Sequence, residues 1–402
     1  MSSVISEKSV VRPYQNMDRI LGRASAILMP LLELGAIGFS TYVFVYSLCI
    51  RYLLAPTPTF QEHGVSPRRS TGIALITLFF IILVIFLLTW MRLIHIIWTN
   101  PGIVPLGDAS IEKDSASARY FDKYAAYTCD YQGRPKWCDK CHNYKPDRAH
   151  HCRELNRCVQ RMDHYCPWAG GIISETSHKF FIQFVFYGML WTGYMLIPMA
   201  YFLAERIRLV RDKPATWIAL VALSAIFCLF TGGMFFMTTW NVSINYTTVE
   251  VVQRGGIENI AMLTTRGHTL ERRSSRTSRR RDGGDGPNIL CEFAREDGRE
   301  YVVFQTQPFE NPWDLGNGKN MRDVMGASVL DWFLPLKMSP CLRHDDPRGE
   351  FRWSPVIYRM AREWEADNPG RRVQLLSHGK RRGSRSERTG SHIERRASHS
   401  AQ

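Results

Sequence analysis

The stretch from Arg161 to Gly171, RMDHYCPWAGG, sets a cysteine beside the two residue types that can activate it. A cysteine attacks as its thiolate, so a neighbouring group must take the thiol proton. His164 has the chemistry of that base, and Asp163 can orient the ring and stabilise the imidazolium. Pro167 disfavours helix at Cys166, which suits the irregular loop that residues so close in sequence need in order to cooperate. The pattern predicts Cys166 as a nucleophile, His164 as its base and Asp163 as the partner of that base.

Five of the ten cysteines in the 402-residue chain lie in the short stretch that begins at Cys138 and ends at Cys166. In an oxidising compartment such density suggests disulfides, whereas in the cytosol it suggests a metal site or catalysis. The spacing favours a metal, because it matches the separations found in zinc fingers, with soft ligands at Cys138, Cys141, His151, Cys152 and Cys158. Spacing alone also allows an alternative in which Cys166 and His164 are zinc ligands together with Cys138, Cys141 and Cys158.

Four blocks of apolar residues are long enough to cross a membrane, since about 20 helical residues span a hydrocarbon layer roughly 30 Å thick. We therefore expect an α-helical integral membrane protein with four transmembrane helices, at residues 26–50, 72–90, 180–202 and 217–237. A soluble domain rarely needs more than one helix that is apolar all round, which argues against a soluble fold. The first block contains Glu33, so either its helix begins near Leu34 or Glu33 faces other helices.

An even number of spans places both ends of the chain on one side of the membrane. A cysteine-rich loop that binds metal belongs in the cytosol, and both termini then lie there too. We expect a multi-pass membrane protein divided into a cytoplasmic N-terminus (1–25), helices 1 and 2 (26–98), a cytoplasmic cysteine-rich domain (99–179), helices 3 and 4 (180–242), a connecting segment (243–263), a disordered basic linker (264–288), a small folded cytoplasmic appendix (289–365) and a disordered basic tail (366–402).

The formal net charge is +14, and much of the excess lies in arginine-rich tracts at 271–281 and 379–398. These tracts contain few apolar residues, so we expect them to be disordered. On the cytoplasmic side of a membrane, basic tracts are attracted to anionic lipid head groups by about 1 kcal/mol per basic residue. The composition therefore favours contact with the lipid bilayer over contact with nucleic acid, and a solvated tail is the alternative.

Four motifs resemble those of one known family. Residues 138–181 resemble the cysteine-rich domain of the DHHC family of protein S-acyltransferases, in a DHYC variant of a kind found in fungi. TNPGIVP after the second span resembles the family's T-x-D-P-G-x-x-P motif, and NYTTVE at 245–250 resembles its T-T-x-E motif. NPWDLGNGKN at 311–320 resembles its C-terminal N-P-x-D-L-G motif. The motifs stand in the family's order and between spans in the family's places.

The resemblance implies an S-palmitoyltransferase that works in two steps. Cys166 would attack the thioester of a long-chain acyl-CoA such as palmitoyl-CoA, hold the fatty chain as an acyl-enzyme and pass it to a cysteine of a substrate protein. By the same resemblance His164 is the base, Asp163 is its partner, and Thr248 of TTVE is a hydrogen-bond partner of Asp163. A sixteen-carbon chain also requires an apolar slot at the membrane face, because each buried CH₂ contributes about 0.8 kcal/mol.

The family usually binds two zinc ions, each through three cysteines and one histidine, and this sequence departs from that pattern. Transferred position by position, the first site is complete, with Cys138, Cys141, His151 and Cys158. The second site falls on four positions, namely Cys152, Leu155, Tyr165 and Ile172. Of these, only Cys152 has a side chain of a type that binds zinc. One thiolate cannot hold zinc in a tetrahedral site. We therefore expect a single zinc ion, with a small hydrophobic cluster in place of the second.

Two other functions are compatible with parts of the sequence. A membrane-anchored zinc finger that binds partner proteins would explain the cysteines, but it leaves the TTVE and NPWDLG motifs unexplained. A catalytically inactive relative would retain the fold without turnover because the second metal is gone.

Overall fold

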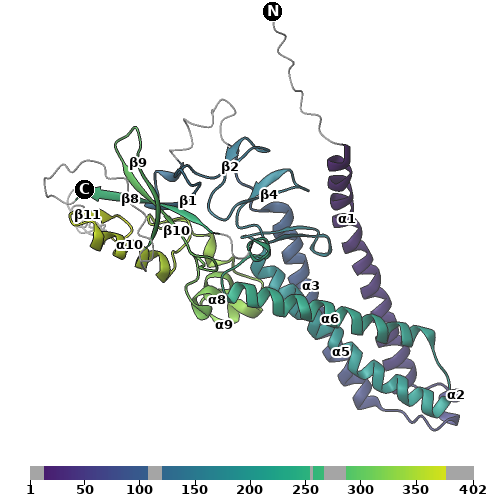
Figure 1. Ribbon diagram of the computed structural model, residues 1–402. Helices are drawn as coiled ribbons and strands as arrows, with labels where there is room; N and C mark the ends of the chain where they lie inside the picture. The colour runs from purple at the N-terminus through teal and green to yellow at the C-terminus, as the bar shows by residue number, and fades with distance from the viewer. Residues whose placement is uncertain (1–12, 107–119, 254–256, 267–286, 377–402) are drawn as a thin grey trace, which may run out of the picture.

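The computed structural model describes residues 13–106, 120–253, 257–266 and 287–376. Among them, four helices are long and apolar enough to cross a membrane, and they form the elongated bundle in Figure 1. These helices are α1 (Pro13–Thr41), which continues into the π-helical segment η1 (Tyr42–Leu54), α3 (Arg69–Thr99), α5 (His178–Val210) and α6 (Ala215–Ser243). The predicted helices at the four apolar blocks are confirmed, and each helix extends past its predicted block. Because α1 runs through Glu33, a helix start near Leu34 is wrong.

The bundle packs through a shared apolar core in which α5 contacts both α3 and α6. Phe86 of α3 stacks on Phe184 and Trp191 of α5, with ring centroids 5.5 and 5.6 Å apart. Aromatic pairs of this kind contribute about 0.5–1.5 kcal/mol beyond the burial of their area. This contact fixes α3 against α5, and the cysteine-rich loop is attached to the ends of these two helices.

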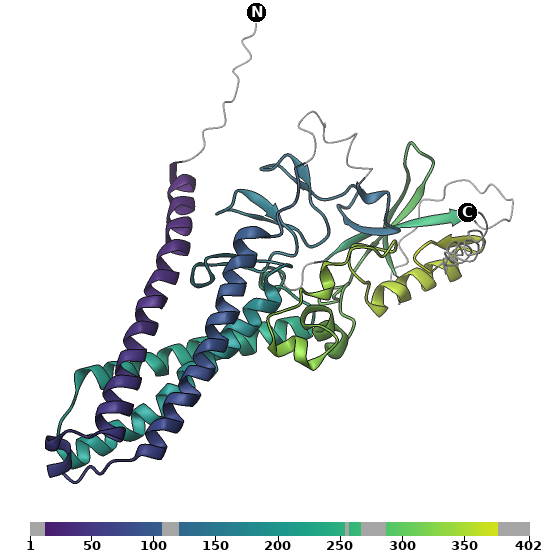
Figure 2. The same cartoon turned by 180° about the vertical axis from the view of Figure 1, so that it is seen from behind.

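Both short connections between the helices lie at one end of the bundle, and the strands lie at the other (Figures 1 and 2). The first connection contains α2 (Pro58–Glu62). Near this end Glu205 of α5 accepts hydrogen bonds from Arg68 and from the hydroxyl of Tyr52, both at 2.7 Å. The start of α1 lies at the strand end, where Arg23 donates to the backbone oxygen of Glu154 at 2.8 Å. This arrangement agrees with an even number of spans.

The cysteine-rich loop folds into three small antiparallel hairpins. Their strands pair as β2 (Trp137–Cys138) with β3 (Asn143–Tyr144), β4 (His150–Cys152) with β5 (Arg157–Val159), and β6 (His164–Cys166) with β7 (Gly171–Ile173). The turn between β6 and β7 is one turn of 3₁₀ helix, η2 (Pro167–Ala169), after which Gly170 takes a φ of 78°. A side chain rarely adopts this backbone conformation, so glycine suits the position.

The C-terminal region is organised around a five-stranded antiparallel sheet. The strand order is β1 (Ala126–Cys129), β8 (Asn259–Arg266), β10 (Glu300–Gln305) and β9 (Asn288–Ala294), and β11 (Arg371–Val373) also pairs with β8. Helix α10 (Pro355–Asp367) packs on the sheet through Ile357 and Trp364. Four shorter helical segments complete this region: α7 (Thr248–Val252), α8 (Asn317–Met325), α9 (Val329–Phe333) and η3 (Pro340–Leu342).

The sheet differs from the predicted division of the chain. The predicted appendix at 289–365 is not a separate unit, because its strands pair with β8, and β8 pairs with β1 from the predicted cysteine-rich domain. Nor does order end at 365, since β11 pairs with β8 and Leu375 is buried. Pairing between distant segments leaves no trace in local composition, which is why the sequence misplaced these boundaries. The basic tracts at 271–281 and 379–398 lie outside the described residues.

Candidate active site

The hairpin formed by β6 and β7 carries the three residues predicted to do chemistry. His164 pairs with Ile173 and Cys166 pairs with Gly171, while the amide of Asp163 donates to the oxygen of Ile173 at 2.9 Å. The segment is thus a short strand rather than the irregular loop that we expected. In a strand, alternate side chains share a face, so His164 and Cys166 project to the same side of the hairpin.

Asp163 and His164 form a close pair. The Nδ1 atom of His164 lies 2.6 Å from Oδ2 of Asp163, whose side chain is 1% exposed. A neutral ring that faces a carboxylate through Nδ1 carries its proton there, which leaves Nε2 as the nitrogen that accepts a proton. Nε2 is buried and has no hydrogen bond to a described nitrogen or oxygen atom. Nε2 is therefore the ring nitrogen that remains available for proton exchange.

Thr248, at the start of α7, holds the other side of the carboxylate. Its amide donates to Oδ1 of Asp163 at 2.8 Å, and its hydroxyl donates to Oδ2 at 3.0 Å. The predicted contact between TTVE and the catalytic stretch is thus present. A carboxylate with several donors keeps its charge even when it is buried.

These contacts set the protonation of the pair. Burial would raise the pKa of the Asp163 carboxyl, but the His178 and His164 rings and the amide of Thr248 outweigh burial and hold this pKa well below its ordinary value. Burial would lower the pKa of the His164 ring, but the hydrogen bond to Asp163 and the interaction with Cys166 raise it to about 10. His164 is therefore a stronger base than free imidazole.

Cys166 sits where the hairpin meets the helical bundle. Its side chain is 8% exposed and belongs to the same buried apolar cluster as Ile97 of α3 and Phe181 of α5. The neighbouring Trp168 reaches α6, with its ring 5.9 Å from that of Phe227. The sulfur thus borders an apolar region between the candidate membrane helices, which is the environment that a fatty chain requires.

The TNPGIVP segment at the end of α3 is hydrogen-bonded to the residues that follow the β6–β7 hairpin. Thr176 donates through its hydroxyl to the oxygen of Asn100 at 2.6 Å, and Ser174 donates to that of Pro101 at 3.0 Å. Gly102 has a φ of 73°, and a Cβ at this position would lie 3.0 Å from Oγ of Ser174. A glycine is needed here both for the backbone conformation and for the close approach.

The NPWDLGNGKN segment caps the end of α6. Asn311 donates to the oxygen of Ile244 at 2.9 Å, and Asn320 donates to that of Ser243 at 2.8 Å. Asn245 donates in return to the oxygen of Trp313 at 2.6 Å. The last carbonyls of a helix lack partners within it, so these amides satisfy them and fix the point from which the chain continues to Thr248.

One group among the described residues has the composition and geometry of a metal site, namely Cys138, Cys141, His151 and Cys158. Their ligand atoms all lie within 4.8 Å of one another, and Nδ1 of His151 lies 3.5 and 3.2 Å from the sulfurs of Cys138 and Cys141. A tetrahedral zinc ion with three sulfurs and one nitrogen spaces its ligand atoms roughly 3.5–3.8 Å apart. The donor set fits a metal ion, and the alternative that recruits His164 and Cys166 as ligands does not match this grouping.

The four positions of the second family zinc site lie together, but in an apolar cluster. Cys152 and Ile172 are buried there with Val159, and Leu155 and Tyr165 pack against them. This cluster joins the β4–β5 hairpin to the β6–β7 hairpin. Apolar packing therefore occupies the place where a second metal would tie the two hairpins together, as we expected.

Comparison with known proteins decides the family. The profile of the DHHC palmitoyltransferase family matches residues 131–255. Palmitoyltransferase pfa5 of Aspergillus fumigatus is 31% identical over 440 residues, which cover 92% of this chain and 98% of the relative. The chain belongs to the DHHC palmitoyltransferase family. Palmitoyltransferase pfa5 of Emericella nidulans is 30% identical over 86% of this chain and 87% of the relative. Palmitoyltransferase ZDHHC15 of Rattus norvegicus is 28% identical over 56% of this chain and 54% of the relative.

Membership in the DHHC family confirms the function predicted from the sequence. The chain is a protein S-palmitoyltransferase, an acyltransferase, rather than a zinc finger that only binds partners. Its four apolar helices are consistent with a multi-pass membrane protein. The cysteine and histidine cluster is consistent with a zinc-binding domain between the second and third of these helices.

A buried ion pair in this DHHC protein was not predicted. Arg148, in the loop between two metal-site residues, donates to both carboxylate oxygens of Glu250 of the TTVE motif, at 2.7 and 2.6 Å. Its side chain is 1% exposed, and it also donates to the side chain and backbone oxygens of Asn245, both at 2.8 Å. Glu250 in turn closes a capping box with Thr247 at the start of α7. Arg148 thereby positions the segment that delivers Thr248.

His178 was missed as well. It begins α5, is fully buried, and its Nε2 lies 3.8 Å from Oδ1 of Asp163. The sequence offers only a histidine next to a lysine at a helix start, which is a pattern with no specific meaning. The contact makes His178 the third residue, after His164 and Thr248, that surrounds the Asp163 carboxylate.

Replacing Arg148 should destabilise the protein strongly. Removing one partner of a buried pair leaves an uncompensated charge and costs about 3–5 kcal/mol, whereas an exposed pair contributes about 0–1 kcal/mol. We expect Arg148→Ala to lower the melting temperature in detergent much more than Arg359→Ala, which removes the exposed pair with Glu310. Equal melting temperatures for the two variants would contradict this role.

The raised pKa of His164 predicts a pH-dependent stability. The pKa of His164 in the folded protein, about 10, exceeds the ordinary value of 6.5. The protonated ring therefore stabilises the folded state fully below pH 6.5, and this stabilisation is lost as the pH rises through about 10. His164→Gln removes this titration. We expect the melting temperature of the wild type minus that of the variant to shrink between pH 6.5 and 10. A difference that stays constant over this range would show that the ring is not held as a strong base.

Proposed function

We propose that the transferred acyl group is carried on Cys166, with His164 as the base and Asp163 as the partner that orients it. The observation that supports this assignment most directly is the 2.6 Å contact between His164 and Asp163 next to a cysteine that borders the helical bundle. The stretch has the base, the carboxylate and the apolar surroundings that thioester exchange with a fatty acyl donor requires.

In the first step, Nε2 of His164 holds the proton that the Cys166 thiol gives up, as the raised pKa of the ring favours, and the sulfur attacks the carbonyl carbon of a long-chain acyl-CoA. The bond between that carbon and the CoA sulfur breaks, and the leaving thiolate takes the proton from the imidazolium. The products are free CoA and an acyl thioester on Cys166. One thioester replaces another, so the step needs no oxidant or reductant.

In the second step, a cysteine of a substrate protein takes the place of CoA. Its thiol gives a proton to His164, its sulfur attacks the acyl carbonyl, and the Cys166 thiolate leaves and is protonated. Asp163 remains ionised throughout, because its role is to hold the ring and stabilise the imidazolium. Thr248 keeps the carboxylate in place while the charge on the ring changes.

We assign Cys138, Cys141, His151 and Cys158 to a single zinc ion with a structural role. When bound, the ion would cross-link the β2–β3 and β4–β5 hairpins, whose own cores are small, and take no part in the acyl transfer. The apolar cluster around Cys152 and Ile172 supports a count of one ion.

The proposed orientation places the cysteine-rich hairpins, the C-terminal sheet and both termini in the cytosol, where acyl-CoA and reduced thiols are found. The arrangement of strands and the start of α1 at one end of the bundle supports a common side for them. Basic tracts at 271–281 and 379–398 would add contact with anionic lipid, and we assign no nucleic-acid partner.

Labelling with a clickable long-chain acyl-CoA tests the nucleophile. The wild type should acquire label through a bond that hydroxylamine cleaves, as expected of a thioester, and Cys166→Ser should acquire none of this label. Cys291→Ser is the matched control, since Cys291 lies in β9 far from the hairpin in sequence and fold. An unlabelled wild type would identify an inactive relative, and label that persists in Cys166→Ser would exclude Cys166 as the acceptor.

Metal analysis tests the zinc assignment. The purified chain should contain one zinc per polypeptide, and Cys141→Ser should lose it because a thiolate ligand is removed. Cys152→Ser should keep its zinc, because Cys152 lies in the apolar cluster rather than among the four ligands. Two ions per wild-type chain, or loss of zinc in Cys152→Ser, would refute the single site.

A further inference from the structure

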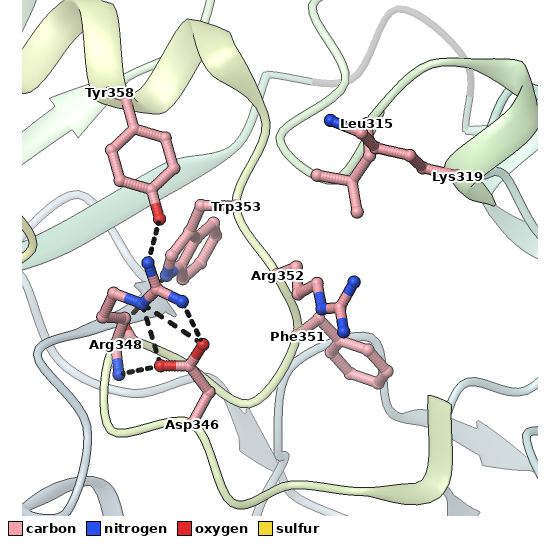
Figure 3. A pocket seen from close by; sticks show the side chains of 8 residues that line it. All are labelled: Leu315, Lys319, Asp346, Arg348, Phe351, Arg352, Trp353 and Tyr358. Carbon is pink, nitrogen blue, oxygen red and sulfur yellow. Dashed lines mark hydrogen bonds and ion pairs between the residues drawn. The ribbon is translucent and has the colours of Figure 1, made fainter. Parts of the chain in front are cut away.

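A pocket with a volume of about 200 Å³ opens in the C-terminal region (Figure 3). It is formed by the NPWDLGNGKN segment and by the residues that precede and begin α10, and it is lined by Leu315, Lys319, Asp346, Arg348, Phe351, Arg352, Trp353 and Tyr358. None of these residues has a part in the acyl transfer proposed above.

The lining carries three cations and one anion. Asp346 forms an ion pair with Arg348, in which Oδ2 of Asp346 lies 2.6 Å from Nη2 of Arg348. Figure 3 shows this pair on one side of the pocket, with Lys319 and Arg352 away from it. Arg352 is 66% exposed, and its Nη1 makes a 3.3 Å contact with Asp323, while its other donors have no hydrogen bond to a residue that the structure describes. Lys319 is exposed and pairs with no acidic group in the part of the chain that the structure describes. The pocket therefore has an excess of positive charge.

Aromatic side chains give the pocket rigid walls. The indole N–H of Trp353 donates to the backbone oxygen of Arg348 at 2.9 Å, and its ring stacks with that of Trp313 at 6.4 Å between centroids. The hydroxyl of Tyr358 accepts a 3.3 Å hydrogen bond from Arg348. Walls held in this way lose little freedom when a ligand binds, so the cations are presented in a preorganised site.

A smaller crevice leads from the pocket toward the catalytic hairpin. It has a volume of about 20 Å³ and shares Leu315, Phe351 and Arg352 with the pocket. Its other lining residues include Arg161, two positions before Asp163, and Arg148, which holds the TTVE segment. The crevice is also lined by Asp323, and Arg148 is paired with Glu250, so Arg161 is the further cation that an anion in the pocket would approach.

We propose that this pocket binds a phosphate group carried by a small molecule or by a lipid head group. Lysine and arginine are the side chains that bind phosphate oxygens, through charge-assisted hydrogen bonds. Two sources present this chemistry at the cytoplasmic face of a membrane, namely soluble nucleotides with terminal phosphates and phosphorylated inositol lipids. Binding from either source is independent of the acyl-enzyme mechanism.

Isothermal titration of the purified full chain in detergent tests the site, with adenosine bisphosphate and inositol trisphosphate as the two probes. The wild type should bind at least one probe, and affinity should fall as salt rises. Lys319→Ala and Arg352→Ala should each weaken binding by about tenfold or more, because each removes a charge-assisted contact. Arg362→Ala is the matched control: Arg362 is exposed on α10 and does not line the pocket, so affinity should not change.

Lys319→Ala keeps the test decisive if Arg352→Ala misfolds through loss of its contact with Asp323. Preference for adenosine bisphosphate that is lost in Lys319→Ala would identify a soluble nucleotide as the ligand of this pocket, and preference for inositol trisphosphate that is lost in the same variant would identify a lipid head group. Equal affinity would show a site that recognises phosphate alone. A wild type that binds neither probe, or a Lys319→Ala variant that binds as tightly as the wild type, would overturn the proposal.

Discussion

The burial of a single carboxylate, that of Asp163, is the constraint on which the catalytic geometry depends. With 1% of its side chain exposed, this charge is costly unless donors surround it. One donor, His164, comes from the β6–β7 hairpin, and the others come from Thr248, which follows the last long helix. The carboxylate is satisfied only when the hairpin and the ends of α5 and α6 come together. In the proposed mechanism, the base for Cys166 is therefore in place only when the bundle is assembled.

The motifs outside the hairpin serve this same assembly. The asparagines of NPWDLGNGKN complete the end of α6, and Arg148 then binds Glu250 and so fixes where Thr248 lies. The proposed zinc ion would hold together the two hairpins on either side of Arg148. Where the family has a second metal, an apolar cluster around Ile172 joins the hairpins instead.

The sequence predicted those features that are encoded locally. The lengths of the four spans follow from the thickness of a bilayer, and the spacing of Cys138, Cys141, His151 and Cys158 predicted a cluster that the structure brings within 4.8 Å. Features that join distant segments were missed. Arg148 and Glu250 are 102 positions apart, and Arg148 is one of many arginines in a basic chain. The pairing of β1 with β8 was missed for the same reason.

We propose that the Asp163 carboxylate, held by Thr248, makes His164 an effective base for Cys166. The most direct measurement is the single-turnover rate of acylation by acyl-CoA in the wild type, Asp163→Asn, Thr248→Val and the double variant. We predict that Asp163→Asn slows acylation by about 10²-fold or more, and that adding Thr248→Val to it has little further effect, since both act through one carboxylate. Acylation by Asp163→Asn at the wild-type rate would contradict the account.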